Sequence, residues 1–243
     1  MTVRPWRDDI KNGKVLTIFP TDKVKNDAGW LQAFKDSIVE FNQLSTTLKL
    51  GVTFSSPPGV KKPDPVGEDG AEVQFDLGDG RLEYEAVGQK FVATDKDTKQ
   101  PINFSKTALH GYTETLALSF GGPGRIRRAF IFLPATPMVT AVMRVGPGPN
   151  DFKDVQRLAG PGIRKFIAVH ELIHACGLSN DEHNATGPDA DTFTINPGVS
   201  AGSFQKPEDD KILLRVNAPN PNVTAPPNFI KKKVADLIRN NWT

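Results

Sequence analysis

The chain is predicted to form one mixed α/β domain, of the α+β kind, in which helices cover a twisted mixed sheet. Three observations lead to this fold class. A strand, a helix and a second strand follow one another between residues 14 and 54. Short segments that alternate apolar and polar residues come next, and a long apolar helix stands near residue 170. Segments with the strand period and with the helix period in one chain are typical of such layered domains.

The first strand–helix–strand unit is predicted from its apolar spacing. Lys14–Pro20 is apolar and β-branched, as in a buried strand. Asp27 can cap a helix that begins at Ala28. The apolar residues of this helix recur at spacings of three and four, namely Trp30, Leu31, Phe34, Ile38 and Phe41. Leu48–Phe54 alternates as a second strand, so we expect a right-handed crossover and a parallel strand pair. Ser55–Gly70, rich in proline and glycine, is expected to be a loop.

The middle of the chain is predicted to be rich in strands. Ala71–Leu77 and Leu82–Ala86 alternate on either side of Gly78-Asp79-Gly80, a pattern that predicts a hairpin. Thr113–Phe120 and Arg128–Leu133 are predicted to be two further strands. The segment between the hairpin and these strands gives no clear assignment.

The segments that flank the long apolar helix are predicted to be mostly irregular. Val145–Asn150 is expected to be a turn, and Asp151–Leu158 a short helix. Residues 184–204 are polar and loop-like. Pro207–Leu214 is expected to be a short helix, because a proline at its first turn is followed by acidic residues.

The end of the chain is predicted to be a linker followed by a helix. Ala218–Pro227 has the composition of an extended linker. The last helix is expected to end near Asn240, with one apolar face made of Phe229, Ile230, Val234, Leu237 and Ile238. Residues 1–217 are therefore predicted to form the main domain. Residues 218–243 are expected to pack on that domain or to mediate association.

Composition excludes several classes of protein. A net charge of +2 is too small to indicate nucleic-acid binding. A single cysteine, Cys176, excludes an internal disulfide framework. No apolar segment has the length of a membrane span or of a signal-peptide core. We therefore expect neither a nucleic-acid nor a membrane partner, and a protein that is cytoplasmic or is secreted after removal of a leader. The oligomeric state stays open.

Three of the four histidines of the chain fall within fourteen residues, at His170, His174 and His183. His170, Glu171 and His174 form an H-E-x-x-H motif within a predicted helix that runs from Gly162 to Cys176 and is stopped by Gly177. Residues four apart lie on one face of a helix, so the two imidazoles can bind one zinc ion. Glu171 can then act as general base toward a water molecule at that ion.

The segment HELIHACGL, from His170 to Leu178, resembles the H-E-x-x-H-x-x-G core of the metzincin zinc peptidases. The resemblance is tight over this segment, and the order of elements from Lys14 to Leu214 is loosely similar. It implies a metzincin-like catalytic domain with a twisted mixed sheet, a zinc-binding helix and an irregular C-terminal subdomain. It also implies an antiparallel edge strand that pairs with the substrate backbone. Thr113–Phe120 and Arg128–Leu133 are the two candidates for that strand.

The third zinc ligand is not fixed by the motif. Metzincins carry a histidine or an aspartate three residues after the glycine, and this chain has Asn180 there. His183 is our preferred third ligand, because neutral imidazole is the commonest partner of zinc. Asp181 is the second choice. In another arrangement, that of the gluzincins, a downstream glutamate completes the site, and Glu208 is the residue that fits it.

Two other departures separate the chain from the metzincin pattern. All three methionines precede the motif, so the methionine that metzincins place beneath zinc is missing at its usual place. Tyr84 and Tyr112 also precede the motif, so no tyrosine follows it to stabilise an oxyanion. These departures favour an alternative, namely a non-catalytic zinc-binding or interaction module that retains a relic of a peptidase site.

The function that the sequence predicts is zinc-dependent hydrolysis of peptide bonds within a peptide or protein substrate. His170, His174 and His183 are the expected zinc ligands, and Glu171 is the expected catalytic residue. A purely structural zinc site has no need of a glutamate beside its ligand, and it commonly has four protein ligands. Glu171 therefore favours the enzyme over the alternative.

Overall fold

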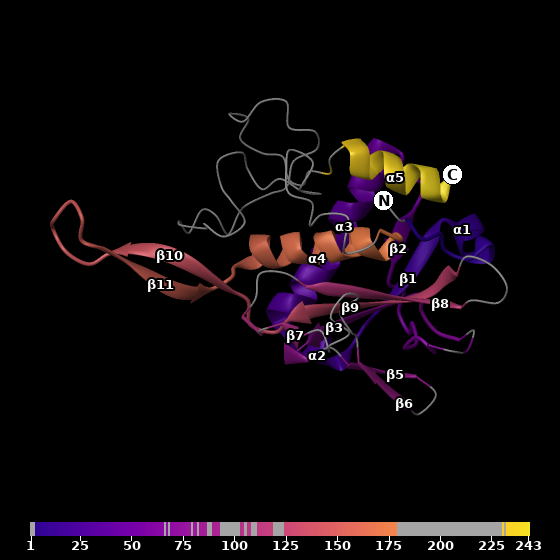
Figure 1. The fold of residues 1–243 in the computed structure, drawn as a ribbon, viewed down its shortest axis with the longest axis horizontal. Coiled ribbons are helices and arrows are strands. Elements are labelled where there is room, and N and C mark those ends of the chain that lie inside the picture. The colour runs from indigo at the N-terminus through magenta and orange to yellow at the C-terminus, as the bar shows by residue number, and fades with distance from the viewer. Residues whose placement is uncertain are drawn as a thin grey trace.

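The computed structural model describes residues 3–65, 67, 69–78, 80–81, 83–86, 89–92, 103–104, 106–107, 111–118, 124–178, 230 and 232–243. In these residues the chain has an α+β fold, with a five-stranded mixed sheet and two long helices packed against it (Figure 1). The predicted fold class is confirmed at this level.

The main sheet has the strand order β2-β1-β3-β9-β8. These strands are Thr53–Ser55 (β2), Val15–Pro20 (β1), Val73–Gly78 (β3), Arg125–Pro134 (β9) and Tyr112–Leu118 (β8). Strands β2, β1, β3 and β9 are mutually parallel, whereas β8 runs antiparallel to β9. Among the strands that the structure describes, β8 is thus antiparallel and lies at the edge of an otherwise parallel sheet.

Two long helices pack beside each other over the sheet: α3, Ala28–Leu48, and α4, Pro161–Ala175. Helix α3 begins as predicted, because the side chain of Asp27 accepts a hydrogen bond from the Trp30 backbone N–H at 2.9 Å. One apolar core lies between the helices and the sheet; its aromatic side chains are Trp6, Trp30, Phe34, Phe41, Phe54, Phe75 and Trp242.

The remaining helices are α1, Asp8–Gly13, α2, Asp22–Asn26, and α5, Lys232–Trp242. Helix α5 lies beside the N-terminal segment near the end of α4 (Figure 1). Four of its five apolar residues are buried in the main core, namely Val234, Ala235, Ile238 and Trp242, whereas Leu237 is partly exposed. Of the helices that the structure describes, none combines the length and the apolarity needed to cross a membrane.

Three two-stranded sheets complete the described elements. Strand β4, Gly80–Arg81, pairs with β7, Asn103–Phe104, and β5, Glu83–Ala86, pairs with β6, Gln89–Val92. Strand β10, Met138–Arg144, and β11, Phe152–Leu158, form a long antiparallel hairpin that projects away from the sheet just before α4 (Figure 1).

The predicted hairpin of Ala71–Leu77 and Leu82–Ala86 is wrong. Strand β3 pairs in parallel with β1 on one side and with β9 on the other, so it is an interior strand of the sheet. Five of its six residues are buried. Both of its edges are therefore occupied by strands that are distant in sequence, and Glu83–Ala86 pairs with β6 instead.

Two other predictions need correction. The second strand is only Thr53–Ser55, because α3 continues to Leu48 and the backbone then turns at Lys49 and Gly51, which both have positive φ. The predicted helix at Asp151–Leu158 is instead strand β11, which pairs along its whole length with β10.

Several predictions lie outside the described residues. They are the irregular C-terminal subdomain, the helix at Pro207–Leu214, the linker and the 217/218 boundary.

Candidate metal centre

Two histidine side chains converge on one face of α4. The Nε2 atoms of His170 and His174 lie 3.1 Å apart, one helical turn from each other. Zinc binds imidazole nitrogen at about 2.0–2.1 Å with tetrahedral geometry, which separates two ligand nitrogens by roughly 3.3 Å. The observed separation is close to this value, so the two rings fit a shared zinc ion with little rearrangement.

Nδ1, the second ring nitrogen of His174, has a hydrogen-bond partner that orients the ring. Nδ1 of His174 lies 3.2 Å from the carbonyl oxygen of Leu178. A carbonyl oxygen only accepts hydrogen bonds, so Nδ1 is the donor, and in the neutral imidazole the lone pair then lies on Nε2. A hydrogen bond of this kind commonly fixes the tautomer and orientation of a metal-binding histidine. The Leu178 carbonyl therefore supports the role predicted for His174.

The face that carries the histidines is partly buried. His174 is buried, with an exposed fraction of 2%, whereas His170 is partly exposed. The ring of His170 lies near that of Phe166, with 6.4 Å between the two centroids and a tilt of 42°. One ring is thus fixed within the protein and the other lies at its surface.

Glu171 points from α4 toward the edge strand of the sheet. Its Oε2 atom accepts a hydrogen bond from the hydroxyl of Thr113, on β8, at 2.6 Å. The backbone N–H of Gly111, just before β8, also donates to this carboxyl group. Burial nevertheless raises the pKa of Glu171 to about 8, because it disfavours the charged form more than these hydrogen bonds favour it.

Gly111 allows β8 to approach the glutamate this closely. A Cβ atom at position 111 would lie 2.7 Å from the carbonyl oxygen of Phe132 and 2.9 Å from Cγ of Glu171. Any larger residue would therefore push the strand away from α4 or displace the carboxyl group. Glycine at 111 and threonine at 113 together define the position of Glu171.

The end of α4 matches the prediction. The helix ends at Ala175, and Gly177 follows with φ of +108°, a conformation that favours glycine. Cys176 is buried, and its thiol donates to the Leu172 carbonyl at 3.4 Å. Burial raises the pKa of this thiol, so Cys176 has the environment of a core residue and not that of a metal ligand.

The described residues bring together only part of the predicted site. His170, Glu171 and His174 lie together on α4, whereas His183, Asp181, Asn180 and Glu208 all lie outside the described residues. Within the described part of the chain, no group of three His, Cys, Asp or Glu side chains is placed to hold a metal ion. The identity of the third ligand stays a prediction.

Thr113 and Gly111 are the site residues that sequence analysis missed. The predicted strand Thr113–Phe120 was a candidate for the substrate strand, but nothing in the sequence indicated that Thr113 or Gly111 contacts Glu171, which is 58 residues away from Thr113. Only the packing of α4 against β8 brings them together.

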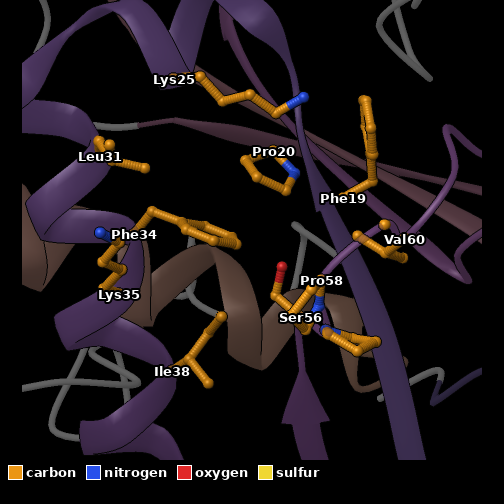
Figure 2. A pocket seen from close by; sticks show the side chains of 12 residues that line it. Phe19, Pro20, Lys25, Leu31, Phe34, Lys35, Ile38, Ser56, Pro58 and Val60 are labelled. Atoms are coloured by element: carbon orange, nitrogen blue, oxygen red, sulfur yellow. The ribbon is translucent and has the colours of Figure 1, made fainter.

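A pocket of about 480 Å³ lies elsewhere, between the first half of α3, the end of β1 and the loop after β2. Phe34 points into it from α3, facing Pro20 and Ser56 (Figure 2). Its walls are mostly apolar, and its charged lining residues are Lys25 and Lys35. Among its described lining residues, none is acidic, none is a histidine and none belongs to α4 or β8. This pocket is therefore separate from the candidate metal centre.

Comparison of the chain with protein-family models, with curated proteins and with solved structures found no match in any of the three.

Proposed function

We propose that the protein is a zinc-dependent endopeptidase with a metzincin-like catalytic domain. The observation that carries this proposal is the convergence of the His170 and His174 Nε2 atoms, 3.1 Å apart, beside a buried glutamate that is held by an edge strand. Paired imidazoles with an adjacent carboxyl group are the arrangement that metal-assisted hydrolysis requires.

His170 and His174 would hold the metal ion, with His183 as the proposed third ligand. The hydrogen bond from Nδ1 of His174 to the Leu178 carbonyl and the partial exposure of His170 both fit this role. A bound zinc ion supplies Lewis-acid polarisation of a carbonyl group and lowers the pKa of a water molecule toward about 7. The chain itself must orient the substrate and move the protons.

Glu171 is the proposed general base. Its carboxyl group accepts hydrogen bonds from Thr113 and Gly111 and is shielded from bulk water, so its position is fixed before a substrate arrives. Positive charge bound at the neighbouring histidines favours the carboxylate form, which can accept a proton from water. In the second half of the reaction, the same group can donate that proton to the departing amine.

Strand β8 is the proposed recognition strand for the substrate backbone. Of the two strands that were candidates from sequence, β9 lies between β3 and β8 in the sheet, whereas β8 is at the edge and antiparallel. A peptide added to this edge would extend the sheet through main-chain hydrogen bonds. Since Thr113 belongs to β8 and contacts Glu171, the peptide would lie next to the general base.

Substitution of the general base tests this proposal. Glu171→Ala and Glu171→Gln are expected to bind as much zinc as the wild type, because neither removes a ligand. Cleavage of a fluorogenic peptide library should fall by at least about a hundredfold, the usual contribution of a general base. Equal cleavage by wild type and both variants would rule out this mechanism.

A second candidate function is a non-catalytic zinc-binding or interaction module. Asn180 at the position of the metzincin third ligand favours it, as does the lack of a methionine or a tyrosine after the motif. The two candidates differ in turnover. Self-cleavage of the purified chain that a chelator stops would favour the peptidase, whereas a zinc-loaded chain that cleaves neither itself nor library peptides would favour the module.

A further inference from the structure

All three tryptophans of the chain donate an indole hydrogen bond to a backbone carbonyl, and two of these carbonyls lie at the end of α4. Each indole is buried, and each Nε1–H donates to a backbone carbonyl oxygen. Trp30, in α3, donates to Ala135 at 3.1 Å. Trp6 donates to Ala175 at 2.8 Å, and Trp242 donates to Cys176 at 2.9 Å. Two of the three therefore bind consecutive carbonyl groups at the end of the helix that carries the histidines.

These carbonyl groups need partners from outside the helix. The last four carbonyl groups of an α-helix have no intrahelical donor, and a buried carbonyl without a donor is costly. Here the donors come from the two ends of the chain, because Trp6 precedes α1 and Trp242 ends α5. The Asn241 amide adds a second bond to the Cys176 carbonyl at 3.1 Å. The Trp6 and Trp242 rings also pack against each other, with centroids 6.4 Å apart.

The N-terminal segment also pairs with the remaining residues of the turn that follows α4, Gly177 and Leu178. The Arg4 N–H donates to the Gly177 carbonyl at 2.9 Å, and Val3 forms an antiparallel bridge with Leu178. The carbonyl of Leu178 is the acceptor for Nδ1 of His174. A continuous set of hydrogen bonds thus runs from the chain ends, through residues 175–178, to the ring of His174.

We propose that Trp6 and Trp242 are positioning residues for the metal centre. Their indole N–H groups hold residues 175–178 in place, and this turn presents the Leu178 carbonyl that fixes the tautomer and orientation of His174. Loss of either N–H would let the turn shift, weaken the His174–Leu178 bond and lower the affinity for zinc. The proposal rests on the proposed metal centre, and it gives both ends of the chain a role in assembling that centre.

Matched substitutions test the proposal with zinc alone as the probe. Trp6→Phe and Trp242→Phe keep an aromatic ring but remove the N–H donor. Trp30→Phe makes the same change at a site that bonds to Ala135 and packs against Arg164, in the first turn of α4 and at the opposite end from Ala175. We would measure the zinc Kd of the full chain by competition with a chelator. The Tm of each metal-free variant would be measured in parallel.

The expected result is a zinc Kd about tenfold higher for Trp6→Phe and for Trp242→Phe, the low end of the effect of disturbing the hydrogen bond that orients a metal ligand, because the Leu178 carbonyl remains but shifts. Trp30→Phe should lower the Tm to a similar extent but leave the zinc Kd within about twofold of wild type. Equal zinc Kd values for all four proteins would overturn the proposal, and so would an equal increase in all three variants.

If a tryptophan variant does not fold, two asparagine substitutions, which remove less buried volume, test the same proposal. Asn241→Ala removes one donor to the Cys176 carbonyl, and Asn42→Ala removes a side chain that donates to the Phe54 carbonyl at 2.9 Å, away from α4. Only Asn241→Ala should raise the zinc Kd. Wild-type protein that binds no zinc would instead contradict the proposed function itself, so the two failures are distinguishable.

Discussion

The hydroxyl group of Thr113 lies 2.6 Å from Oε2 of Glu171 and joins the edge strand β8 to the helix α4. Both side chains are buried. A hydrogen bond of this length to a carboxyl group restricts the carboxyl to one orientation. The proposed substrate strand and the proposed general base are therefore joined by a direct, buried hydrogen bond.

Removal of this hydrogen bond is expected to slow catalysis without weakening substrate binding. Thr113→Val keeps the shape of the side chain but cannot donate, so Glu171 loses its fixed orientation, and kcat should fall by about tenfold while KM changes little. Thr113→Ser keeps the hydroxyl group and should retain most of the activity. Steady-state kinetics on a cleaved library peptide would measure both. An unchanged kcat in Thr113→Val would mean that the hydrogen bond has no part in catalysis.

Gly111 is expected to tolerate no side chain. In Gly111→Ala the new methyl group would press on the Phe132 carbonyl and on Cγ of Glu171, so the free energy of unfolding should decrease by about 1–3 kcal/mol. Gly13→Ala is a matched control, because a Cβ atom there meets nothing within 4 Å. Its effect should stay within about 0.5 kcal/mol. Denaturant unfolding of the two variants measures the difference, and equal effects would show that β8 can move away from α4 at little cost.

The pH dependence of stability is expected to report the burial of Glu171. Its pKa of about 8 in the folded state lies above its ordinary value of 4.5, so the folded state binds this proton more tightly than the unfolded state. The free energy of unfolding should therefore decrease as the pH rises between these two values, by up to about 1.4 kcal/mol per pH unit from this group. Below pH 4.5 the group contributes no such slope, since it is protonated in both states.

Comparison of wild type with Glu171→Gln isolates this contribution, because the amide cannot ionise. Chemical unfolding of metal-free protein at several pH values between 5 and 8 is the measurement. The variant should gain stability relative to wild type as the pH rises. Parallel curves for the two proteins would mean that the carboxyl group is not buried as described.

Much of the fold could be predicted where the signals are local. The cap at Asp27 and the apolar spacing of α3 lie within a few turns of one another, and the same holds for α4 and the glycine at 177. Such patterns depend on neighbours in the sequence and need no knowledge of the rest of the chain.

The errors arose where pairing is distant in the sequence. Gly78-Asp79-Gly80 has the composition of a hairpin turn, but β3 is held by β1 and β9, which are far from it along the chain. In β11 the apolar residues Phe152, Val155 and Leu158 recur every three positions, which suits a helix, and pairing with β10 overrides this spacing. Local propensity is a weak guide when tertiary contacts supply most of the stability.

The candidate site was likewise predictable only in part. His170, Glu171 and His174 lie on one helix, so their spacing alone placed them together. Thr113, Gly111 and the tryptophans at the chain ends reach the site through tertiary packing, for which a single sequence holds no signal.

The choice of third ligand is open to a direct comparison of histidine variants. His183→Ala is expected to lose most of its zinc affinity, because two imidazoles alone bind the ion far less tightly than three. His110→Ala removes the fourth histidine of the chain, which directly precedes Gly111, and unchanged zinc affinity in this variant would exclude His110 as a ligand. Zinc affinity can be measured by competition with a chelator. Retention of zinc by His183→Ala together with its loss in Asp181→Ala or Glu208→Ala would transfer the role to that residue.

The metal content of the purified chain, determined by elemental analysis, tests the central claim most directly. The wild type should contain about one zinc ion per chain after refilling, and His174→Ala should contain little or none. Their folded state would be checked by circular dichroism. A wild type that binds no zinc even after refilling would contradict the account, because no metal-dependent peptidase function could then rest on His170 and His174.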